Sequence, residues 1–102
     1  MEGAEALDQS AERQMQNKPE LPQQRRRMRT AFIVRLYEIV DASVSEFVNA
    51  YEIANAIGMD ENEARRVVEY FEEKGYLKVD DHRSGVVRIT AEGIDHVEAL
   101  SV

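Results

Sequence analysis

The sequence predicts a mainly α-helical domain with one small β-hairpin, in the order helix, helix, helix, hairpin, helix. Apolar residues recur at steps of three and four in the predicted helices, and the period falls toward two after Gly75. A chain of 102 residues with 43% hydrophobic residues has enough apolar surface for one modest core. These limits favour a single domain and exclude large enzyme folds.

The first helix is expected at about residues 26–42. It begins in "RRRMRTAFIVRLYEIVDA", and its large apolar residues recur at helical spacing, which marks an inward face made of Phe32, Ile33, Leu36, Ile39 and Val40. The next stretch, "SVSEFV", fits either a loop or a brief strand.

The first 24 residues differ in composition from the rest. They are rich in Gln, Glu, Ala and Asn, carry Pro19 and Pro22 near their end, and hold almost no large apolar groups. Such a segment cannot offset the entropy lost on ordering. We therefore predict a disordered tail at 1–24 and a folded domain at 25–102. Without a signal sequence or an apolar run long enough to span a bilayer, the expected location is the cytoplasm, with no membrane contact.

Two short helices follow, each with a capping signal. In "NAYEIANAIG", Asn49 caps the helix and Glu52 completes a capping box, while Gly58 ends it. In "DENEARRVVEYFEEKG", Asp60 is the cap and Gly75 fits a left-handed helix end. The inward stripe of this second helix is predicted to be Ala64, Val67, Val68 and Phe71.

A hairpin and a last helix complete the chain. "YLKVD" and "VVRIT" flank the polar loop "DHRSG", which fits two antiparallel strands with an exposed tip. Thr90 then caps "AEGIDHVEAL", whose Gly93 weakens the first turn. The predicted inward residues of this helix are Ile94, Val97 and Leu100.

The stretch "YEIANAIGMDENEARRVVEYFEEKGYL" followed by a polar loop and "VRITAEGIDHVE" resembles the winged helix-turn-helix domains of small bacterial and archaeal transcription regulators. The resemblance covers roughly residues 30–100. It implies that helix 60–74 is a recognition helix for the major groove of double-stranded DNA and that 76–90 is the wing. Family habit also implies a homodimer.

The resemblance points to specific candidate DNA contacts. On the outward face of helix 60–74, Arg65 and Arg66 can reach guanine edges or phosphates, and Asn62 can pair with adenine. The alternative is that the two arginines are solvated or paired with glutamates one helical turn away. At the wing the candidates are His82 and Arg83 at the tip, with Lys78 on the strand behind them.

Positive charge is concentrated in one place. The net charge is −7, but residues 25–30 hold four arginines and no acid, namely Arg25, Arg26, Arg27 and Arg29. This run is interpreted as an arm that meets DNA phosphates, as a contact for an acidic protein surface, or as an ordinary charged helix start. Because the chain as a whole repels a polyanion, any contact with nucleic acid must be local.

The residues contain no pattern typical of catalysis. Cysteine is absent, and we see neither a nucleophile–base pair nor a Gly-rich phosphate loop. Asp80, Asp81 and His82 are adjacent in sequence and cannot all converge on one ion, so no metal and no cofactor is expected. The leading hypothesis is a DNA-binding regulator without enzymatic activity; the alternative is a winged-helix module that binds protein and not DNA.

Overall fold

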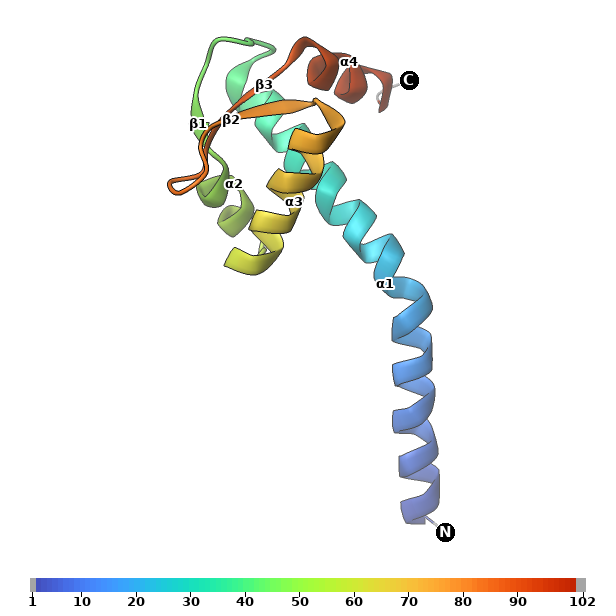
Figure 1. Ribbon diagram of the computed structural model, residues 1–102. Helices are drawn as coiled ribbons and strands as arrows, with labels where there is room; N and C mark the ends of the chain where they lie inside the picture. Colours follow the sequence, from blue (N-terminus) through green and yellow to red (C-terminus); the bar gives the residue numbers. More distant parts are fainter. Residues whose placement is uncertain (1, 101–102) are drawn as a thin grey trace.

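The structure is a computed structural model that describes the backbone of residues 2–100 and the side chains of residues 21–100. Four helices and a three-stranded sheet follow one another along the chain (Figure 1). Their bounds are α1 Glu2–Val40, β1 Val48–Asn49, α2 Ala50–Ala56, α3 Glu61–Lys74, β2 Leu77–Asp81, β3 Val86–Ile89 and α4 Ala91–Leu100. The predicted order of elements is confirmed, with the short strand β1 added before α2.

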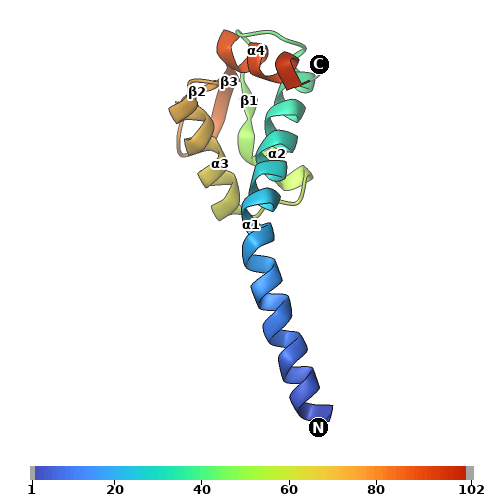
Figure 2. The same cartoon turned by 90° about the vertical axis from the view of Figure 1, so that its right-hand side faces the viewer.

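Helix α1 is longer at its N-terminus than the predicted 26–42. It runs from Glu2 to Val40 and ends there because Asp41 and Ala42 have left-handed φ values of 51° and 58°. Its first half extends away from the other elements, whereas its second half packs among them (Figure 2). The boundary between a tail and a domain at residue 24 stays a prediction, since the side chains of 1–20 lie outside the described residues.

The sheet has the strand order β1-β3-β2, and both pairings are antiparallel. The hairpin β2–β3 has the predicted position, with an irregularity between Val79 and Asp81. Val48 pairs with Val87, so the stretch before α2 ends in the brief strand that was one of the two alternatives. This pairing ties the start of α2 to the wing.

The predicted N-cap residues are confirmed, whereas among the described residues Glu52 contributes only its backbone N–H and does not complete a capping box. Asn49 Oδ1 accepts hydrogen bonds from the backbone N–H groups of Tyr51 and Glu52, at 2.9 and 3.2 Å. Asp60 Oδ1 accepts one from Glu63 N at 2.8 Å. At the end of α3, Gly75 has a left-handed φ of 78°. The caps satisfy amides that a helix start leaves free, and so fix where α2 and α3 begin.

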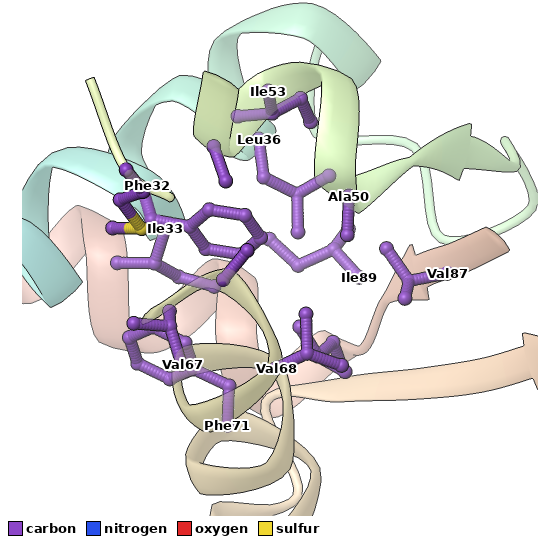
Figure 3. Packing of buried hydrophobic residues seen from close by; sticks show 14 of the residues in the cluster. Phe32, Ile33, Leu36, Ala50, Ile53, Val67, Val68, Phe71, Val87 and Ile89 are labelled. Carbon is purple, nitrogen blue, oxygen red and sulfur yellow. The ribbon is translucent and has the colours of Figure 1, made fainter. Parts of the chain in front are cut away.

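One hydrophobic core joins α1, α2, α3 and the sheet (Figure 3). At its centre the rings of Phe32 and Phe71 stack with their centroids 6.1 Å apart. The predicted inward stripe of α3 is buried throughout. Two predicted core residues are exposed: Ile39 is 41% exposed, because Val40 takes the inward position one turn after Leu36, and Leu100 is 47% exposed in the last turn of α4.

Helix α4 starts against the connection between α3 and β2. Thr90 Oγ1 accepts a hydrogen bond from Gly93 N at 3.0 Å, which confirms the predicted cap. Gly93 is buried, and a Cβ at this position would collide with the carbonyl oxygen of Tyr76. Gly93, which was predicted only to weaken the helix, therefore allows α4 to pack closely against the backbone of Tyr76, directly before β2.

Within the described part of the chain, no helix has the length and apolar character needed to cross a membrane.

Candidate nucleic-acid interface

Helix α3 presents its two candidate arginines on different sides. Arg65 lies on the side of Glu61 and pairs with it, Nη2 to Oε1, at 3.6 Å. Its side chain is still 54% exposed, and an exposed ion pair of this kind contributes little free energy. The Arg65 guanidinium thus remains available to a ligand. Asn62, in the first turn, is exposed as well.

The tip of the wing is held on the Arg65 side of α3. His82 Nε2 lies 3.2 Å from Glu72 Oε2, and Glu72 follows Arg65 by seven residues, which is two helical turns. The tip also contacts the start of α2, because Tyr51 Oη donates to the His82 carbonyl at 3.3 Å and Ala50 N donates to the Gly85 carbonyl at 2.8 Å. Three separate contacts therefore fix the wing relative to α2 and α3.

Inside the wing tip, Asp81 organises the turn. Its carboxylate accepts hydrogen bonds from Ser84 Oγ at 2.9 Å and from Arg83 N at 3.0 Å. The bond from the Ser84 hydroxyl is the main cause that lowers the pKa of Asp81, and the bond from Arg83 N adds to it, so both favour the charged carboxylate. The Arg83 side chain is exposed beside it.

The strands behind the tip carry two further basic residues with different surroundings. Lys78 on β2 is exposed. Arg88, its cross-strand neighbour, donates from Nη1 to the Val44 carbonyl at 3.3 Å and so holds the loop before β1. Lys78 remains a candidate contact, whereas Arg88 has a structural partner.

Arg66 lies on the other side of α3 and lines an open groove against α1. The groove encloses about 760 Å³. It brings Arg66 together with three members of the α1 arginine run, Arg25, Arg27 and Arg29, whereas Arg26 does not line it. Its full lining is Leu21, Gln24, Arg25, Arg27, Met28, Arg29, Met59, Asp60, Glu63, Arg66, Val67 and Tyr70. We call it the arginine groove.

Two interactions order the edges of the arginine groove. The Arg29 guanidinium lies over the ring of Tyr70, with Cζ 4.4 Å from the centroid. On the α3 edge, the hydrogen bond from Glu63 N is the main cause that lowers the pKa of Asp60, and the charge of Arg66 contributes. The groove therefore holds four arginines and two acids, Asp60 and Glu63, at its rim.

Most of the predicted contact residues thus divide between two sides of α3. Arg65, with Asn62 one helical turn before it, lies on the side of the wing tip, and Arg66 joins α1 in the arginine groove, which Arg26 does not line. Sequence spacing alone did not predict this groove, although Glu63, Arg66 and Tyr70 of its lining follow one another on α3 at steps of three and four, which places them on one side of the helix.

Comparison with known proteins bears on the fold. No family model and no curated protein matches the sequence. Among solved structures, an apo-form mutant of ZitR from Lactococcus lactis is similar, with a TM-score of 0.56 over 93% of this chain and 70% of that chain, at 11% sequence identity. The chain has a winged-helix fold. At this low identity the similarity shows the fold alone.

Proposed function

We propose that this winged-helix chain is a DNA-binding transcription regulator that places α3 in the major groove and the wing on the adjacent backbone. One observation carries the proposal: the contact between His82 and Glu72 fixes the wing tip on the side of α3 where Arg65 is exposed. A recognition helix and a wing held in this way can meet one duplex together. The similarity to ZitR supports the winged-helix fold on which the proposal rests.

Each exposed group on this surface has a chemical role in the proposal. Arg65 and Asn62 are the candidates for base edges, since a guanidinium pairs with guanine and an amide with adenine. Arg83 and Lys78 meet phosphates. His82 positions the wing through Glu72. A regulator of this kind works in the cytoplasm, where it has access to DNA.

The carboxylates of α3 set the strength expected of this contact. Glu69 and Glu73 are exposed, and the chain carries a net charge of −7. Both features repel phosphates, so binding rests on a few local cations and weakens as the salt concentration rises.

An NMR titration of ¹⁵N-labelled protein with mixed-sequence duplex DNA at low salt tests the proposal. We expect the largest shifts at residues 61–66 and 82–84, with the amides of α4 as internal controls. Arg65→Ala should reduce the shifts, whereas Arg35→Ala, which alters an exposed arginine paired with Glu38 on α1, should leave them unchanged. Unchanged resonances at 61–66 in the presence of excess DNA would rule the proposal out.

A protein-binding module is the second candidate, and the arginine groove favours it. Four arginines around an apolar floor suit an acidic amphipathic segment better than a duplex, because a duplex offers no side chains to cover Leu21 and Tyr70. The same titration separates the two candidates, since a pure protein-binding module leaves 82–84 unperturbed by DNA.

A further inference from the structure

The arginine groove combines an apolar floor with a cationic rim. Met59 and Val67 are buried in the floor, and Leu21 and Tyr70 are 43% and 38% exposed along it. The ion pairs found among residues 21–100 are Arg35–Glu38, Arg65–Glu61 and His82–Glu72, so none of them uses a rim arginine. A fitting occupant supplies apolar side chains flanked by carboxylates.

We propose that the arginine groove receives the acidic N-terminal segment, residues 2–15, of a second copy of this chain. The inference goes beyond DNA binding and does not depend on it. It assigns Arg25, Arg27, Arg29 and Arg66 to a contact between two protein copies, which was one of the alternatives for the arginine run.

The sequence of that segment matches the groove. Its acids are spaced by three or four residues, as are its apolar residues, and this is the spacing of residues that share one side of a helix. The acidic set is Glu2, Glu5, Asp8 and Glu12, and the apolar set is Ala4, Leu7, Ala11 and Met15. Four carboxylates thus complement four arginines.

The path of α1 favours a second copy over the chain's own segment. Residues 2–40 form one helix, and its first half leads away from the groove that its second half lines (Figures 1 and 2). Residues 21–29 cover about 12 Å of α1 and residues 2–15 cover about 20 Å at about 1.5 Å per residue, so the segment is long enough to span the groove. Two antiparallel copies of α1 can exchange these segments reciprocally about a two-fold axis.

Sedimentation equilibrium of the full-length chain over a range of concentrations tests the inference. We expect a dimer whose dissociation constant rises at least about tenfold in Arg25→Glu/Arg27→Glu, because like charges then meet across the interface. Arg26→Glu is the control: it reverses one charge on the same helix outside the groove, and should dimerise like the wild type.

A charge swap makes the test specific. Glu5→Arg/Asp8→Arg/Glu12→Arg alone should weaken the dimer to a similar degree, and adding it to Arg25→Glu/Arg27→Glu should restore association. Neither Arg25 nor Arg27 belongs to the hydrophobic core, and circular dichroism melting verifies that each variant folds. A wild type that stays monomeric, equal effects of the groove and Arg26 variants, or no restoration in the combined variant would each overturn the inference. Successful DNA binding by a monomer would leave the proposed function standing.

Discussion

Gly85 lies against the ring of Tyr51 so closely that a Cβ on Gly85 would meet Cδ2 of the ring at 2.6 Å. Gly85 is the last residue of the wing loop between β2 and β3, and Tyr51 lies in the first turn of α2. Their contact, together with the Tyr51 hydroxyl bond to the His82 carbonyl, closes the wing onto the helices. The position of the wing is therefore a property of the packed domain and not only of the hairpin.

Gly85→Ala should displace the wing and destabilise the domain by about 1–3 kcal/mol, from strain at a φ of 77° and from the collision with Tyr51. Gly58→Ala is the control, because Gly58 has a φ of 89° but nothing within 4 Å of the added methyl group. Urea unfolding of both variants measures the difference, and Tyr51→Ala in the Gly85→Ala background should recover part of the loss. Equal costs for the two glycines would show that the ring contact is unimportant.

Gly93→Ala should destabilise the chain although alanine is the better helix former by about 1 kcal/mol. The added methyl group would collide with the Tyr76 carbonyl, which is backbone and cannot rotate away. Thermal unfolding should show a clear loss of Tm for Gly93→Ala and almost none for Glu92→Ala at the exposed neighbouring position. A gain in Tm for Gly93→Ala would contradict the packing of α4 described above.

Phe71→Ala should cost about 3–5 kcal/mol, since it removes the ring that stacks on Phe32 at the centre of the core. Ile39→Ala should cost far less, because Ile39 is 41% exposed despite its place in the apolar pattern of α1. Chemical denaturation of the two variants compares them directly. A loss below about 1 kcal/mol for Phe71→Ala would mean that the inner face of α3 is assigned wrongly.

Acid should weaken the start of α3. The hydrogen bond from Glu63 N lowers the pKa of Asp60 in the folded state. The stability that the charged Asp60 carboxylate contributes is therefore fully present above the unfolded pKa of about 4, and it is lost as the pH falls through the lower folded pKa. Asp60→Asn keeps a capping side chain that does not titrate. Its Tm should therefore fall less steeply than that of the wild type below about pH 4. Parallel curves for the two proteins would argue against the charged cap.

Local signals in the sequence were sufficient for most of the fold. Asn49, Asp60 and Thr90 cap helices as their types and positions predict, because a cap is decided by residues three or four places away. Ile39 failed as a core prediction because periodicity marks a broad face and not which of two neighbouring residues other elements cover.

The candidate site was less predictable, because it depends on which elements meet. The sequence places Arg65 and Arg66 side by side, yet one shares a side of α3 with the wing contact and the other faces α1. Likewise, nothing local to His82 indicates that Glu72 is its partner, since the pairing arises only when the hairpin folds back on α3. The spacing of residues along the sequence does not predict such long-range contacts.

The salt dependence of DNA affinity tests the central claim most directly. Fluorescence anisotropy with a labelled duplex should give a negative slope of log affinity against log salt, and Arg83→Ala should flatten that slope by about 0.9, the share of one phosphate contact. Arg35→Ala, which changes an exposed arginine on α1, should leave the slope as in the wild type. Absence of binding at low salt, or an Arg83→Ala slope equal to that of the wild type, would contradict the placement of the wing on DNA.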